Sequence, residues 1–156
     1  MTEQIEQVFF TNPLFSLLEE VFVTHHGIFL DANTSLFQTL ETVSAEQASV
    51  PVGGKCASLA AQVAHVIFYL EVLERFVVNK DSSPADWGEI WRTVEKVTPA
   101  EWNALRDRIK QTYYRIENMF KTNPAWDEDS IGGAMAVVVH SAYHLGEIRQ
   151  ALCTLT

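Results

Sequence analysis

VVVHSAYHLGEIRQ, the stretch at residues 137–150, places His140 and His144 in a run that is otherwise mostly apolar. A spacing of four residues brings two side chains to the same face of an α-helix, one turn apart. Two neighbouring imidazoles on one helix face can chelate a metal ion. The stretch therefore predicts a helix that belongs both to the core and to a metal site.

A third histidine, His65, lies in a second apolar run, LAAQVAHVIFYL at residues 59–70. A single buried histidine is more often a hydrogen-bonded core residue than a ligand, but three uncompensated imidazoles cost free energy to bury. A bound metal removes that cost. Three protein ligands leave a coordination position for water or substrate, as in catalytic sites. We therefore expect His65, His140 and His144 to form one mononuclear site.

Two familiar metal motifs do not fit the chain. The zinc-protease motif His-Glu-x-x-His requires a glutamate where Ser141 stands. The ferritin-like di-iron motif requires a glutamate three residues before a histidine, but Gln62 precedes His65 and Val137 precedes His140 at that spacing. A three-histidine site remains.

Apolar periodicity and capping signals predict four long helices, and no period-2 strand stands out, so the expected class is an all-α four-helix bundle. Asn12-Pro13 and Thr98-Pro99-Ala100-Glu101 are helix starts, and Asn123-Pro124 ends the third helix. The predicted helices cover residues 13–43, 58–79, 99–121 and 131–152, within one domain over 1–156.

Two segments interrupt or connect the predicted helices. Gly27 lies inside the first predicted helix, where a break is an alternative, although the continuing apolar period favours one long element. The connection at residues 79–97 contains Trp87 and Trp91 and is long enough to cross the end of the bundle, so we expect it to pack as a lid.

The net charge indicates which classes of partner are disfavoured, and the cysteines indicate the cell compartment. A formal net charge of −9 disfavours nucleic acid and anionic lipid as partners, and no apolar run is long enough to span a bilayer. Cys56 and Cys153 lie nine residues from a proposed ligand, too far along a helix to join the metal site. With no Cys-x-x-Cys and no basic, apolar signal segment at the start, we expect a cytoplasmic protein with free thiols.

Further residues are candidates for the site. Glu147 follows the histidine pair on the same face and is expected to orient a ligand or act as a base, a solvated ion pair being the alternative. Tyr143 is a second candidate catalytic residue, and Tyr69 is expected to line the pocket, unless both serve packing. His25 fits the inward stripe of the first helix as a fourth ligand or as a partly buried histidine.

Two stretches carry a resemblance to a known family. SLAAQVAH at residues 58–65 and HSAYHLGEIR at residues 140–149 are similar to the second helix and to the His-x-x-x-His-x-Gly-Gln/Glu-Ile signature of the DinB-like (DinB/YfiT) superfamily of metalloenzymes. The resemblance implies a mirror variant of the up-and-down bundle, a divalent metal such as Zn or Ni held by His65, His140 and His144, and frequent dimers.

The family includes transferases and isomerases that use a low-molecular-weight thiol such as bacillithiol or mycothiol, and others described as hydrolases. We expect transfer of such a thiol to a small-molecule electrophile. A metal-dependent hydrolase and a non-catalytic, stress-related binding protein are the alternatives. We also expect a homodimer through the first and third helices, with two sets of candidate contacts: Leu36, Phe37 and Leu40, or Tyr113, Tyr114 and Phe120.

Overall fold

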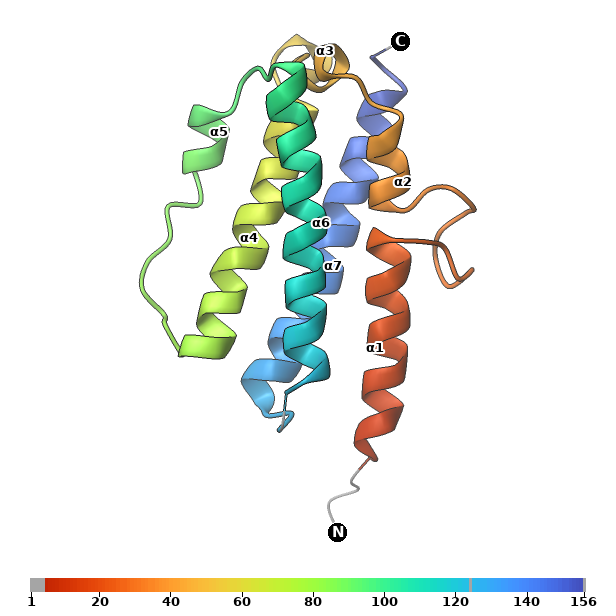
Figure 1. Ribbon diagram of the computed structural model, residues 1–156, viewed down its shortest axis with the longest axis vertical. Coiled ribbons are helices and arrows are strands. Elements are labelled where there is room, and N and C mark those ends of the chain that lie inside the picture. Colours follow the sequence, from red (N-terminus) through yellow and green to blue (C-terminus); the bar gives the residue numbers. More distant parts are fainter. Residues whose placement is uncertain (1–4, 124, 156) are drawn as a thin grey trace.

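The computed structural model describes residues 5–123 and 125–155, and these residues contain helices but no strand (Figure 1). This confirms the all-α class. The elements are α1 (Gln7–Phe22), α2 (Leu36–Glu41), α3 (Ala45–Ala48), a 3₁₀ turn (Val52–Gly54), α4 (Leu59–Asn79), α5 (Glu89–Thr93), α6 (Pro99–Lys121) and α7 (Glu128–Leu152).

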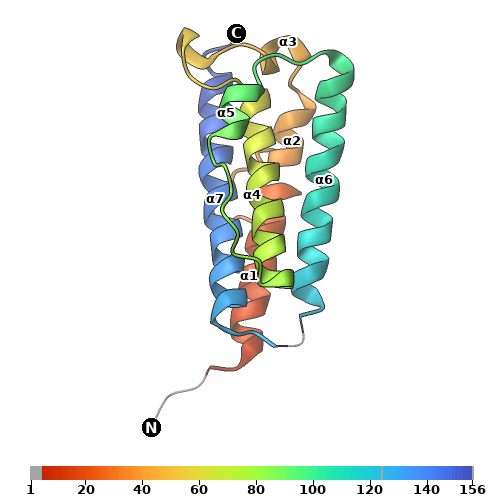
Figure 2. The ribbon, with the colours of Figure 1, turned by 90° about the vertical axis from the view of Figure 1, so that its left-hand side faces the viewer.

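The long helices α1, α4, α6 and α7 lie side by side (Figures 1 and 2). In the view of Figure 1, α1 and α7 run upward, whereas α4 and α6 run downward. Helix α4 packs against both α6 and α7, and α1 packs mainly against α7. Because α4 and α6 are parallel, the connection at residues 80–98 must return along the length of α4, and α5 lies on this return (Figure 2).

Side-chain caps set the start of three of the long helices. Thr98 and Glu101 form a capping box around Pro99, as predicted, and Ser58 accepts a hydrogen bond from the Ala61 N–H. The last helix begins at Glu128, earlier than predicted, because the Asp127 side chain caps it by accepting from the Ser130 N–H. Pro124, the predicted terminator of the third helix, lies outside the described residues.

The predicted helix over 13–43 is wrong. Helix α1 begins at Gln7, so Pro13 lies inside it rather than at its first position, and it ends at Phe22. Residues 23–35 are irregular, with Gly27 in the left-handed region at φ 76°. The residues that carry the apolar period through this segment, His25, Ile28 and Ala32, are exposed, so the period does not mark a core-facing helix here.

The buried carboxylate of Glu20 explains the break. It accepts hydrogen bonds from four backbone N–H groups that a continuing helix would have used internally, those of His26, Ile28, Phe29 and Leu30, at 3.0, 3.0, 3.2 and 3.3 Å. Burial alone would raise the pKa of Glu20, but these hydrogen bonds outweigh burial and hold the pKa below its ordinary value. The segment after α1 is therefore folded around one side chain.

The core takes up most of the residues that we expected at a dimer interface. Five of the six candidate contacts are buried within the chain, and only Tyr114, which is 53% exposed, is accessible. The five are Leu36, Phe37, Leu40, Tyr113 and Phe120. Those contacts are therefore wrong, because α2 folds back onto α6 and α1. Phe37 of α2 packs edge-on against Tyr113, and Phe22 of α1 stacks on the same ring.

Among the residues described, no single helix combines the length and apolar character needed to cross a bilayer. The segments Ala45–Gly54 and Leu59–Asn79 reach that threshold only as a pair, and the pair is bent by 97°.

The role of Glu20 can be tested by substitution. Glu20→Ala removes the shared acceptor and should lower the free energy of unfolding by at least about 2 kcal/mol, with a smaller loss for Glu20→Gln. Glu20 has a lowered folded-state pKa, so its stabilisation is complete above the ordinary glutamate pKa of about 4.3 and is lost as the pH falls through the folded value. Urea unfolding at several pH values measures both effects. The exposed neighbour substitution Glu19→Gln is the control, and an equal loss for both variants would contradict this role.

Candidate metal centre

Three histidines predicted from the sequence meet between α4 and α7. His65 comes from α4, and His140 and His144 come from α7. One nitrogen from each ring lies within 4.8 Å of the others. The ring centroids are 5.2 Å apart for His65 and His140, 5.0 Å for His65 and His144, and 4.5 Å for His140 and His144. The predicted convergence is confirmed.

The packing of α4 on α7 explains why the three rings meet. Helix α4 is apolar around most of its first half and is buried there, so His65, only 7% exposed, has no direction in which to reach water. His144 is 5% exposed on the facing side of α7, and His140 lies one turn earlier on the same face. The helical spacing and the helix contact together place the site.

The hydrogen bonds of His144 leave one ring nitrogen free. Its Nδ1 lies 2.6 Å from Gln62 Oε1 and 2.9 Å from Glu147 Oε2, and since both atoms accept, Nδ1 carries the proton. Nε2 then presents a lone pair. Within the described chain, the buried His65 Nδ1 and His140 Nε2 have no hydrogen-bond partner.

Orphaned buried nitrogens of this kind fit a metal ion. An unpaired buried polar group costs about 1–3 kcal/mol, and a metal bond would offset that cost at several rings together. Two nitrogens bound to one ion at about 2.1 Å are at most about 4.2 Å apart. The nitrogens of the three rings, all within 4.8 Å of one another, lie close to this range.

The electrostatics of the cluster favour neutral imidazoles. Burial, with smaller contributions from His144 and His65, lowers the pKa of His140 to about 4. Burial also lowers the pKa of His65, helped by His144 and opposed by Glu147. The pKa of His144 is lowered by burial against the opposing effect of Glu147. Neutral imidazole is the form that binds metals.

Aromatic side chains cover the histidines from the side of α4. The prediction that the connection crosses the end of the bundle is wrong, because the connection returns along α4. Trp91 of α5 stacks on His65 with ring centroids 4.3 Å apart. Tyr69 of α4 stacks on His140 at 3.6 Å with an interplanar angle of 10°. Trp87 packs against Phe68 and Tyr69. The return connection thus shields the site on the α4 side.

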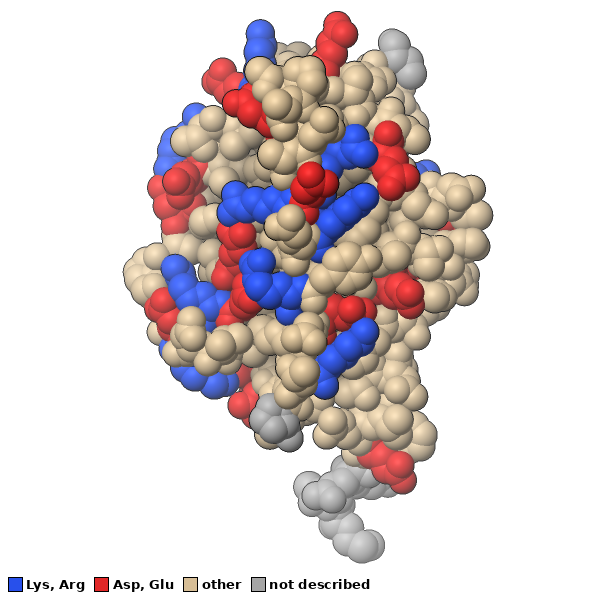
Figure 3. Space-filling view, in the orientation of Figure 1, with Lys and Arg blue, Asp and Glu red and all other residues tan. Residues whose placement is uncertain are grey.

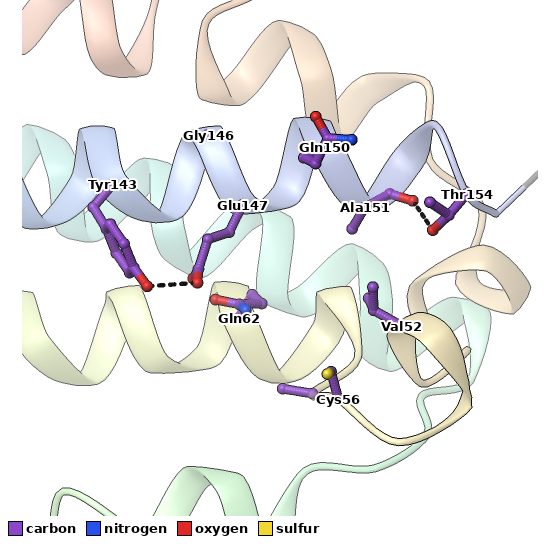
Figure 4. A pocket seen from close by; sticks show the side chains of 10 residues that line it. Val52, Cys56, Gln62, Tyr143, Gly146, Glu147, Gln150, Ala151 and Thr154 are labelled. Atoms are coloured by element: carbon purple, nitrogen blue, oxygen red, sulfur yellow. Dashed lines mark hydrogen bonds between the residues drawn. The ribbon is translucent and has the colours of Figure 1, made fainter.

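Glu147 and Tyr143 lie on the Nδ1 edge of the His144 ring, away from Nε2. The Tyr143 hydroxyl donates to Glu147 Oε1 at 2.7 Å, and this hydrogen bond raises the pKa of Tyr143 (Figure 4). Glu147 Oε2 contacts Nδ1, whereas a metal would use Nε2. This geometry favours the orienting role for Glu147, and a role as a base, like a catalytic role for Tyr143, stays a prediction.

Gln62 is a site residue that the sequence reasoning missed. It entered only as the residue that breaks the Glu-x-x-His pattern before His65, yet its amide oxygen makes the shortest polar contact of His144. The signal was its position, one turn before a proposed ligand and on a helix face with few other polar residues.

A cavity of about 520 Å³ opens beside Gln62 and Glu147, the two residues that contact His144 Nδ1 (Figure 4). Its polar wall includes Gln62, Tyr143 and Glu147, and Cys56 lies across from them. An occupant of this cavity would contact the residues that orient His144 rather than the free ring nitrogens.

Other candidates lie elsewhere. His25 is exposed in the segment after α1 and does not join the cluster, and the His26 ring pairs with Glu19 at 3.0 Å. Cys56 and Cys153 are exposed free thiols and lie outside the cluster of His65, His140 and His144.

The chain was compared with known proteins, and no family model, curated protein or solved structure matches it. The resemblance to the DinB-like superfamily therefore stays a prediction that rests on the quoted motifs.

Metal loading tests the three ligands. We expect one Zn²⁺ or Ni²⁺ per chain and a higher melting temperature, since a ligand at 100 times its dissociation constant adds about 2.7 kcal/mol. His140→Ala should lose both effects, whereas His26→Ala, which changes an exposed histidine outside the cluster, should keep them. Elemental analysis and calorimetry check this, and equal metal content in both variants would refute the site.

Substitution of the orienting residues tests the second set of contacts. Gln62→Ala and Glu147→Gln each disturb a hydrogen bond to His144 Nδ1, and such losses typically weaken metal binding about 10- to 100-fold. Gln150→Ala is the matched control, because Gln150 lines the same cavity without a hydrogen bond to His144. Titration against a fluorescent chelator gives the affinities. Unchanged affinity in both variants would mean that these contacts do not support the ligand.

Proposed function

We propose that this chain is a divalent-metal-dependent enzyme of the DinB-like type that transfers a low-molecular-weight thiol to a small electrophile. The observation that carries the proposal is the convergence of three largely buried imidazoles, of which His65 and His140 have a buried nitrogen without a partner. Zn or Ni is the metal that this donor set suits.

The residues of the chain have separate tasks in this proposal. His65, His140 and His144 hold the ion, and Gln62 with Glu147 fixes the tautomer and orientation of His144. Trp91 and Tyr69 keep water from the ring faces. When bound, such an ion lowers the pKa of a thiol or water at its open position.

Thiol chemistry is favoured over peptide hydrolysis by the absence of a base near the free nitrogens among the described residues. Ser141 occupies the position of the protease glutamate and is fully buried. Glu147 is held at Nδ1 of His144, on the far edge of the ring. A thiol that is deprotonated by coordination needs no such base. The net charge of −9 also disfavours large anionic substrates.

The proposal extends to the finer fold and the setting. The up, down, down, up course of α1, α4, α6 and α7 supports a single-domain four-helix bundle of the mirror type. The exposed free thiols of Cys56 and Cys153 support a reducing, cytoplasmic compartment.

A second candidate is a non-catalytic metal or ligand-binding protein. It is favoured by the cavity of about 520 Å³ beside Gln62 and Glu147, which lies on the side of His144 away from its free nitrogen. A ligand held there would be bound without reaching the metal.

A transferase assay separates these candidates. Metal-loaded protein is incubated with a chlorodinitrobenzene and several thiols, and we expect the carbon–sulfur bond to form as chloride leaves and the thiol proton passes to solvent. His144→Ala should abolish the metal-dependent rate, and His26→Ala should not. Equal rates for wild type and His144→Ala, together with metal-dependent ester hydrolysis, would reverse the order of transferase and hydrolase. No turnover of either kind would favour the binding protein.

A further inference from the structure

The outward face of α7 is an exposed stripe without a charged residue. On successive turns it presents the six residues that we call the α7 stripe: Gly132, Met135, Val139, Tyr143, Gly146 and Gln150. Met135 is 54% exposed, Val139 67% and Tyr143 61%. Large apolar side chains gathered on one face mark an interaction site.

Helix α6 shows what a water-facing helix of this protein looks like. Lys and Arg alternate with Asp and Glu over the face that it presents in Figure 3. Arg108 and Arg115 pair there with Glu71 and Glu74 of α4. In a chain with 20% charged residues, the uncharged stripe of α7 is therefore a local feature and not a consequence of composition.

Five residues of the α7 stripe are placed symmetrically about Val139, and the sixth, Gln150, lies opposite Glu128 in the same arrangement. Gly132 lies seven residues before Val139 and Gly146 seven after it, whereas Met135 lies four before and Tyr143 four after. Two copies of α7 packed antiparallel about a twofold axis at Val139 would set glycine against glycine and Met135 against the partner's Tyr143. A twofold interface is self-complementary in this way, so the pattern selects a second copy of this chain as the occupant.

The two glycines also point to a second helix. A Cβ atom added at Gly132 or Gly146 would meet nothing within 4 Å, so packing within the chain does not require glycine there. Gly133 differs, because its Cβ would lie 3.1 Å from Val77. Glycine weakens a helix interior relative to alanine. Close approach of another helix would explain why glycine stands at both Gly132 and Gly146.

The charges at the ends of α7 are complementary in the same arrangement. The helix begins with Glu128 and Asp129, and its last turn carries Arg149. Antiparallel packing brings the acidic first turn of each helix to the end where the partner's Arg149 lies.

Two exposed phenylalanines on the α1 flank of the α7 stripe would also meet in the antiparallel arrangement. Phe9 of α1, 68% exposed, lines a groove with Met135 and Val139, and Phe29, 46% exposed, lines another with Gly146. The twofold axis lies in the interface and is perpendicular to both helices. It therefore places the α1 flanks of the two chains on the same side of the interface, so Phe9 faces the partner's Phe29. Both would leave water on association.

The size of this face suits a stable dimer. Helix α7, with 25 residues, is about 37 Å long and α1, with 16 residues, about 24 Å, and at about 10 Å of width each they give on the order of 600 Å² per chain. Stable interfaces bury about 800 Å² per partner.

We propose that this protein forms an antiparallel homodimer through the α7 stripe, with Val139 on the twofold axis. The partner helix covers Tyr143, whose hydroxyl donates to Glu147, so the dimer also shields the hydrogen bonds that orient His144. The dimer does not depend on a bound metal.

Sedimentation of the full chain tests the surface. Wild type should sediment at twice the chain mass of 17.6 kDa, and Val139→Glu, which sets two carboxylates against each other at the axis, should sediment at the chain mass. Val50→Glu is the matched control on an exposed valine beside α3, and it should stay dimeric. A monomeric wild type, or a dimeric Val139→Glu, would overturn the proposal, and a monomer would leave the stripe to a different partner.

Cysteine cross-linking tests the geometry without relying on a disruptive variant. In a Cys56→Ser, Cys153→Ser background, Val139→Cys should form a disulfide-linked dimer under mild oxidation. Met135→Cys alone should not, but it should cross-link when mixed with Tyr143→Cys. Efficient cross-linking of Met135→Cys with itself would indicate parallel helices and refute the antiparallel arrangement.

Discussion

The hydrogen bonds of His144 Nδ1 are the interaction on which the site depends. Gln62 accepts across the contact between α4 and α7, and Glu147 accepts along α7. Together they keep the proton on Nδ1 and turn Nε2 toward the other two histidines. Without them the ring could flip or change tautomer, and the cluster would lose one of its three metal-binding nitrogens. The contact between two helices thus fixes the chemistry of one imidazole.

The path of the chain determines how the histidines are covered. Because α4 and α6 are parallel, the chain must travel the length of α4 before α6 begins, and it carries Trp91 over His65 on the way. A tight turn after α4 would have left the face of His65 open to water or packed a third long helix over it. The return connection covers the ring with one aromatic side chain instead, and α5 is held by few other contacts to the core. Access to the histidines is therefore set by a short segment rather than by the long helices.

The sequence predicted the parts of this protein that local periodicity controls. The helices over 58–79 and 99–121 and the three histidines follow from spacing and capping, which act over one or two turns. The helix over 13–43 failed because the Glu20 carboxylate captures backbone N–H groups six to ten residues away, and no helical pattern records that competition. Gln62 was missed for a similar reason, since its partner His144 is 82 residues distant.

Helix α7 has two faces that favour exclusion of water. Its inward face carries His140 and His144, which need water excluded, and its outward face carries Met135 and Val139, which also favour exclusion of water. A helix that is apolar on both faces is ordinarily buried on both. Within one chain, α1 and α4 cover only the inner side and the flanks. The proposed antiparallel dimer would cover the outer side with an identical α7, so that one helix sequence would supply both surfaces of the interface.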